Sequence, residues 1–230
     1  MSAKLPPQSV QIKALISAKP FDPLTVAQLE SYASQQATTG TYDFDANKAL
    51  LKFYQCYPDQ LKVDVVASVL VLSLTKLPKN DFLMLSYLIP GRIISGNPKI
   101  KTTQKCAELL EGGKFQEFWA EYATNASELF TAAGFTDSIR NLIAENIKFT
   151  FKTINSDKFS SMIGLSSSDV GAFCTSSEHV QELKGSTVVM TSCAENQPRL
   201  QHFEESLRFD EALRLVDSLR RTEGISRGTV

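Results

Sequence analysis

Apolar residues in the first 135 positions recur every three or four residues, in short segments separated by proline or glycine. This spacing places the apolar side chains on one face of a helix and predicts a series of short amphipathic helices. The breaks between the helices fall at Pro23, Gly40, Pro58, Pro78, Pro90 and Gly112-Gly113. Consecutive helices of similar size with short connections favour a HEAT-like helical stack over residues 1–135, although no sequence repeat is evident.

The segment 63–74 contains the longest apolar run of the chain. Val71 and Leu72 do not share the helical face of the other apolar residues, so we expect a helix covered on more than one side. A membrane-spanning helix needs about 20 apolar residues, and this run is too short. The segment therefore predicts a helix buried among its neighbours.

The pattern changes after Gly134. Isoleucines spaced along one face as far as Ile154 predict a long helix over residues 136–154. Ser156 and Ser166 are each expected to cap the start of a short helix. Three helices are thus predicted in this part of the chain.

Two short extended segments follow these helices, at 179–183 and 186–191. Lys184-Gly185 lies between them and suits a hairpin turn. Three helices followed by a small β-hairpin is the order of a winged helix, which we predict over residues 136–200. The predicted fold class is therefore mainly α.

A C-terminal helix is predicted over residues 201–221, and a flexible tail over 222–230. Its apolar seam, the candidate partner interface, consists of Phe209, Ala212, Val216 and Leu219. Arginines alternate with acidic residues around this seam. Such a helix either folds back on its own chain or packs against helices of a partner, and the sequence leaves both alternatives open.

Composition and charge restrict the classes of partner. The chain has 230 residues, of which 43% are hydrophobic and 21% charged, with a net charge of −1. These values are typical of a globular protein and lack the basic excess of a wide nucleic-acid-binding face. The expected third helix of the winged helix, 166–177, has one Asp and no Lys or Arg. Because phosphate contact needs cations, we expect the winged helix to bind protein, with RNA or DNA binding as the alternative.

The segment 42–60 begins like a calcium loop, with oxygen-bearing side chains at alternate positions: Asp43, Asp45 and Asn47. The sixth loop position, which needs glycine, is Lys48, and the twelfth, which needs glutamate, is Tyr54. The acids are better explained as helix-start residues, with Asp45 as the N-cap. We therefore expect no metal site and no cofactor.

The stretch 111–122 contains two features of interest. Its Gly-Gly-Lys lacks the earlier glycine, the following Ser or Thr and the preceding strand of a phosphate loop, so we interpret the glycines as a helix end.

Four aromatic residues follow: Phe115, Phe118, Trp119 and Tyr122. We interpret these aromatics as core, with a partner interface as the alternative.

The cysteines are scattered at Cys56, Cys106, Cys174 and Cys193, without a C-x-x-C pair. The N-terminus has no apolar h-region of a signal peptide, so we expect reduced thiols in the cytoplasm and no metal cluster. Cys174 and His179 are close in sequence and give the one hint of a nucleophilic enzyme. Spacing alone does not place a thiolate beside an imidazole, so we expect no enzyme.

Three segments, "YDFDANKALLKFYQCYP", "FQEFW" and "GFTDSIRNLI", resemble subunit k of eukaryotic translation initiation factor three. The similarity runs in order from Gln28 to Ile163 and continues weakly to "FDEAL". The motifs are not chemical signatures; their order and spacing carry the resemblance. It is weak in the wing and in the tail.

This resemblance implies a HEAT-like domain followed by a winged helix, related to the PCI-type subunits of large assemblies. It implies a non-catalytic scaffold subunit that supports translation initiation on the small ribosomal subunit. The partners implied are other initiation factor subunits, chiefly the l subunit, with indirect ribosome contact. No catalytic or metal-binding residues carry over. A PCI-type scaffold subunit of another large complex is the alternative.

Overall fold

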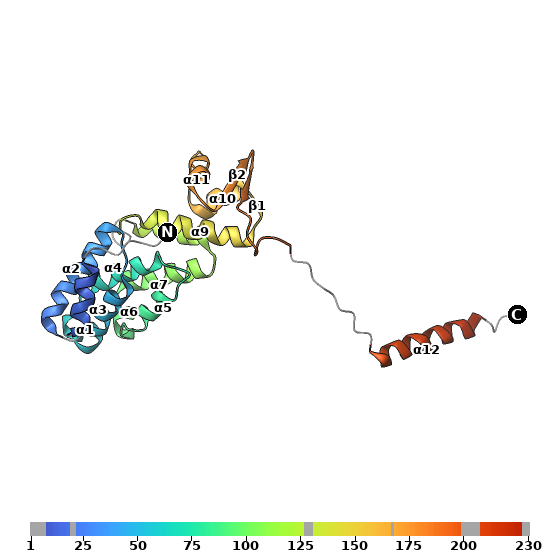
Figure 1. Cartoon of the computed structure of the whole chain (residues 1–230), viewed down its shortest axis with the longest axis horizontal. Coiled ribbons are helices and arrows are strands. Elements are labelled where there is room, and N and C mark those ends of the chain that lie inside the picture. The colour runs from blue at the N-terminus through green and yellow to red at the C-terminus, as the bar shows by residue number, and fades with distance from the viewer. Residues whose placement is uncertain (1–7, 19–21, 127–130, 167, 199–207, 227–230) are drawn as a thin grey trace. The chain divides into compact units, whose positions relative to one another are not determined.

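The computed structural model describes residues 8–18, 22–126, 131–166, 168–198 and 208–226. The chain divides into two units, Met1–Gln197 and Pro198–Val230. The first unit contains a stack of helices and a small sheet with its own helices, and the described part of the second contains one helix (Figure 1).

The helical stack of the first unit consists of α1 (Ser9–Ala18), α2 (Pro23–Thr39), α3 (Phe44–Cys56), α4 (Val63–Leu74), α5 (Asp81–Ser86), α6 (Gly91–Gly96), α7 (Pro98–Glu111) and α8 (Phe115–Asn125), with a 3₁₀ turn at Pro58–Gln60. Helix α2 packs on α3 and α4, α4 packs on α7, and α7 packs on α8. Proline lies at the first position of α2 and α7, where its missing N–H leaves no helical hydrogen bond unmade.

Helix α4 is the centre of the stack. Val66, Val69, Leu70 and Leu74 are completely buried, and Val71 and Leu72 are nearly so. Helices α2 and α7 both pack against it. The prediction that this apolar run is a helix buried on more than one face is confirmed.

Helices α2 and α3 are joined by a buried amide pair. The Gln36 Nε2 donates to Asn47 Oδ1, and Asn47 Nδ2 donates to Gln36 Oε1, both at 3.1 Å. The Asp43 backbone N–H donates to the same Gln36 Oε1 at 2.8 Å. Asp43 is the N-cap of α3 and accepts from the Ala46 N–H, whereas Asp45 lies in the first turn. The predicted cap at Asp45 is wrong by two positions.

The rest of the first unit has the order of a winged helix: α9 (Phe135–Thr150), β1 (Thr153–Asn155), α10 (Ser156–Ile163), α11 (Val170–Ser176), β2 (Val180–Lys184) and β3 (Thr187–Met190). The strands form one antiparallel sheet in the order β1-β3-β2. Gly185 turns the hairpin with a φ of 58°, in the left-handed region that suits glycine. The predicted hairpin is confirmed.

The predicted long helix to Ile154 is wrong at its end. Helix α9 stops at Thr150, because Phe151 is extended, and Ile154 lies in β1 opposite Val188. Ile154 and Val188 are both buried, so this strand closes the sheet over the core of the winged helix. Helix α11 also begins later than expected, at Val170, and Ser166 Oγ donates to the Asp169 carboxylate at 2.6 Å just before it.

The second unit contains α12 (Phe209–Ser226). This helix continues beyond residue 221, where the sequence predicted a tail, and residues 201–207 and 227–230 lie outside the described part. The predicted fold class, mainly α with a winged-helix-like part, is confirmed. The division at residues 135 and 200 stays a prediction.

Candidate functional site

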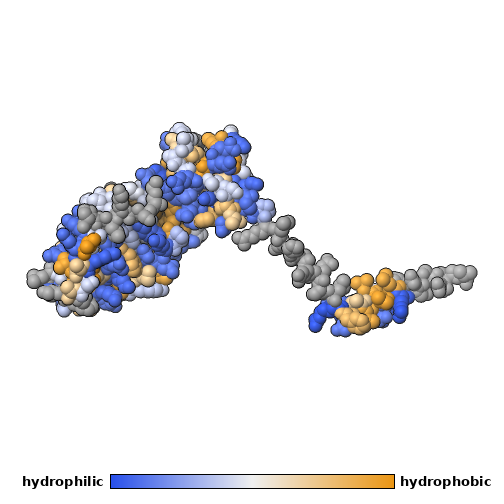
Figure 2. Space-filling model, in the orientation of Figure 1, coloured by the Kyte–Doolittle hydropathy of each residue, from blue (hydrophilic) through white to orange (hydrophobic). Residues whose placement is uncertain are grey.

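The predicted seam residues all lie on α12 with their side chains exposed to solvent. Phe209 is 78% exposed, Val216 46% and Leu219 57%, and Ala212 is exposed as well. Figure 2 shows the apolar colouring gathered along this helix. Large apolar side chains are favoured inside a fold, so a row of exposed ones indicates an interaction surface.

The apolar face of α12 is wider than the sequence prediction. Leu213 and Leu215 are 47% and 57% exposed, and neither belongs to the predicted seam. At about 100° per residue, Leu213 lies beside Phe209 and Leu215 lies beside Leu219. The spacing of four from Phe209 to Leu213, and from Leu215 to Leu219, was the available signal. The α12 apolar face is therefore defined as Phe209, Ala212, Leu213, Leu215, Val216 and Leu219.

The opposite side of α12 is polar and charged. Asp210 and Glu211 lie in the first turn, where carboxylates oppose the helix dipole. Arg214 and Asp217 continue this side along the helix. A helix with one apolar and one charged side can lay the apolar side into a groove or against the helices of another chain. This arrangement supports docking onto a partner and does not by itself indicate a catalytic role.

The winged helix has a recognition helix without cations. Helix α11 has the sequence VGAFCTS, and Asp169 precedes it. Sequence-specific DNA recognition through such a helix uses side chains that pair with phosphates and base edges. The geometry therefore gives no support to nucleic-acid binding through α11.

The predicted aromatic group connects the stack to the winged helix. Phe118 is fully buried and Phe115 nearly so, which confirms core packing for these two. Trp119 and Tyr122 are partly buried, and the Trp119 Nε1 donates to the Met162 carbonyl at 2.9 Å. Tyr122 stacks on Phe135 at 6.1 Å between ring centroids.

Cys174 and His179 do not form a catalytic pair in the described residues. No hydrogen bond joins the two side chains, and the His179 Nδ1 is buried without a partner. Burial raises the pKa of the Cys174 thiol and lowers the pKa of His179. A nucleophilic cysteine needs the opposite, a lowered thiol pKa beside a cation or a helix N-terminus.

The part of the chain that the structure describes contains no group of three or more His, Cys, Asp or Glu side chains able to hold a metal ion. Asp43 is used as a helix cap and Asn47 in the amide pair, so neither is available as a calcium ligand. Of the helices described, none combines the length and apolar character needed to cross a membrane.

Comparison with known proteins gives one family match and several similar proteins. Residues 60–196 match the CSN8/PSMD8/EIF3K family. Eukaryotic translation initiation factor 3 subunit K of Drosophila erecta is 36% identical over 145 residues, and that of Drosophila sechellia is 37% identical over the same length. The aligned part spans 63% of this chain and 64% of each of those relatives.

Proposed function

Because the chain belongs to the CSN8/PSMD8/EIF3K family, we propose that it is a non-catalytic scaffold subunit of eukaryotic translation initiation factor three. It supports translation initiation on the small ribosomal subunit through protein–protein contacts, in the cytoplasm. The observation that carries this proposal is the similarity to subunit K proteins over 63% of the chain. The family match over residues 60–196 includes helices α4 to α8 and the whole winged helix.

The partners are other subunits of the factor, chiefly the l subunit, with the ribosome contacted indirectly. The α12 apolar face supports this role, since it presents six apolar residues on a helix that needs no further folding to dock. A preformed helix has less conformational entropy to lose on binding than an unfolded segment. We assign the subunit contact to this face.

The chemistry of the chain supports a scaffold over an enzyme. The Cys174 thiol has a raised pKa, and the sole described histidine has a lowered one. The other histidine, His202, lies outside the described residues. Nucleophilic catalysis by Cys174 would need its thiolate at neutral pH, which a raised pKa disfavours.

Affinity purification of the tagged full chain from cell extract tests this function. Mass spectrometry at low and at moderate salt should recover initiation factor subunits in stoichiometric amounts, with the l subunit most resistant to salt. Recovery of the chain alone, or of the subunits of a different large complex, would contradict the proposal. An unrelated tagged helical protein of similar size serves as the control for nonspecific capture.

A further inference from the structure

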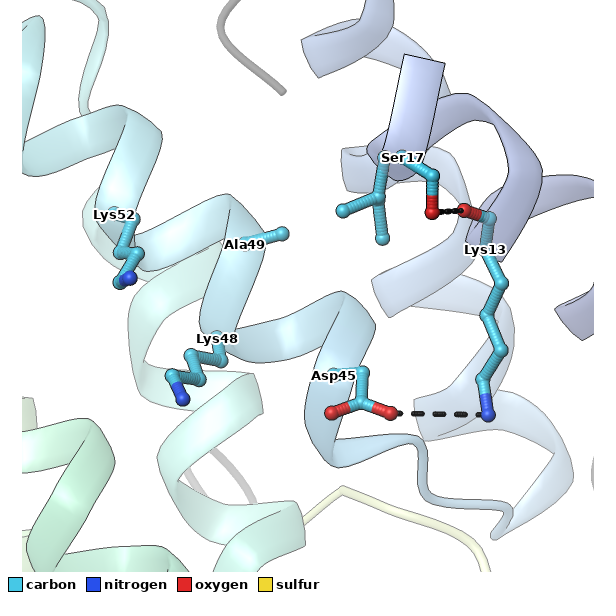
Figure 3. Close-up of a pocket in the computed structure, with 7 residues that line it drawn as sticks. Lys13, Ser17, Asp45, Lys48, Ala49 and Lys52 are labelled. Atoms are coloured by element: carbon cyan, nitrogen blue, oxygen red, sulfur yellow. Dashed lines mark hydrogen bonds and ion pairs between the residues drawn. The ribbon is translucent and has the colours of Figure 1, made fainter. Parts of the chain in front are cut away.

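Helices α1 and α3 enclose a groove of about 420 Å³ on the helical stack (Figure 3). It is lined from α1 by Lys13, Ile16 and Ser17, and from α3 by Asp45, Lys48, Ala49 and Lys52. Helix α1 has only Ser9 and Ile12 buried among its described residues, so it forms a shallow outer wall. The groove lies in the first unit, on a different element from the α12 apolar face.

The floor of the groove is apolar. Ile16 and Ala49 are partly buried and pack against the core of the stack. Figure 3 shows Ala49 pointing from α3 toward α1. An apolar side chain of another molecule could cover Ile16 and Ala49 here. All three side chains would then be removed from water, which favours binding.

The rim of the groove is basic. The Lys13 Nζ lies 3.7 Å from the Asp45 carboxylate, so these two charges satisfy each other. Lys48 and Lys52 are one turn apart on α3, and neither forms an ion pair within the described part of the chain. Like charges at this spacing destabilise a helix. Two positive charges thus lie beside an apolar floor without a compensating carboxylate, although the Lys48 Nζ also lies 5.6 Å from the centroid of the Phe44 ring.

We propose that the α1–α3 groove docks an acidic amphipathic helix of a partner protein. The apolar residues of that helix would cover Ile16 and Ala49, and its carboxylates would pair with Lys48 and Lys52. The combination of floor and rim favours a peptide over a nucleic acid, because a phosphate backbone offers no apolar side chains to cover the floor. This inference does not depend on the function proposed for α12.

Fluorescence anisotropy with the full chain tests the proposal. The probe is a fluorescein-labelled synthetic helical peptide with leucines along one face and glutamates beside them. We expect binding that is lost when lysines replace the glutamates, and lost when serines replace the leucines. The double variant Lys48→Glu/Lys52→Glu should weaken binding about tenfold at low ionic strength, since two exposed ion pairs become repulsive. The double variant should instead bind the peptide in which lysines replace the glutamates.

Lys101→Glu is the control for a charge reversal elsewhere, because Lys101 is exposed on α7 and does not line the groove. It should leave binding unchanged, and circular dichroism should show native helix content in both variants. The proposal is overturned if the acidic peptide does not bind the unmodified chain, or if Lys101→Glu weakens binding as much as the double variant. It is also overturned if an RNA oligonucleotide displaces the peptide and itself depends on Lys48 and Lys52.

Discussion

The Trp119 indole N–H donates to the backbone carbonyl of Met162 at 2.9 Å and so ties helix α8 of the stack to helix α10 of the winged helix. The ring lies against Gly164, the residue that ends α10. The Arg140 guanidinium of α9 lies 5.7 Å from the ring centroid. One aromatic side chain of α8 therefore contacts both α9 and α10, the first two helices of the winged helix.

Gly164 cannot accept a side chain without disturbing this contact. Its φ is +68°, and an added Cβ would lie 2.6 Å from Trp119 Cδ2. We predict that Gly164→Ala lowers the free energy of unfolding by about 2–4 kcal/mol, from left-handed strain together with the clash. Urea denaturation of the full chain measures this change.

Gly113→Ala separates the two causes. Gly113 has nearly the same φ, +71°, but nothing lies within 4 Å of the added Cβ. This variant should lose only the conformational part, about 1 kcal/mol. Equal losses in the two variants would show that the Trp119 contact contributes nothing.

The amide pair between α2 and α3 gives a second stability prediction. Asn47→Ala removes the acceptor of the Gln36 Nε2, and the Gln36 side chain is completely buried. We expect a loss of about 1–3 kcal/mol in the free energy of unfolding. Gln55→Ala on the exposed side of the same helix should change it by less than about 0.5 kcal/mol. A loss equally small for Asn47→Ala would contradict the role assigned to the amide pair.

The order of helices could be predicted because proline and glycine mark where they end, and apolar spacing marks their buried faces. Pro58, for example, lies just after the end of α3 at Cys56, whereas Pro90 lies directly before α6. The end of α9 could not be predicted from the sequence. Ile154 lies seven residues after Ile147, a spacing that fits a helix as well as a strand. Its partner in the sheet, Val188, is distant in sequence, and a three-residue strand is too short to show alternation.

Part of the α12 apolar face could be predicted from the sequence, because it depends on the spacing of apolar residues. An amphipathic helix is a local pattern, so Phe209, Val216 and Leu219 could be assigned to one face. The sequence prediction missed Leu213 and Leu215, although both are spaced four residues from a seam residue, and their exposure shows the full width of the face. The α1–α3 groove could not be predicted, because its walls come from helices separated by the whole of α2.

The cysteines should differ in reactivity in a way that tests the enzyme alternative. Cys56 is exposed, whereas burial raises the pKa of the Cys106 thiol to about 11 and also raises that of Cys174. We predict that iodoacetamide at about pH 8 labels Cys56 first and Cys106 last, because the thiolate is the reacting form. Timed labelling with peptide mass mapping measures the order. Faster labelling of Cys174 than of Cys56 would revive a nucleophilic role for Cys174.

The α12 apolar face gives the prediction closest to function. Val216→Asp places a carboxylate at the centre of that face, where a partner would have to bury it without a counter-charge. We expect co-purification with sister subunits to fall by more than about tenfold. The isolated chain should keep its free energy of unfolding within about 0.5 kcal/mol, because Val216 is exposed there.

Ser218→Asp is the matched control for this variant. Two residues correspond to about 200° around the helix, so Ser218 lies on the polar side, and the added charge is the same. Co-purification should survive this change if the apolar face binds the partner. If both variants lose the partner, the added charge and not the face is responsible. If Val216→Asp unfolds the isolated chain, the face belongs to the core of its own chain, because only a buried position could make one carboxylate so costly.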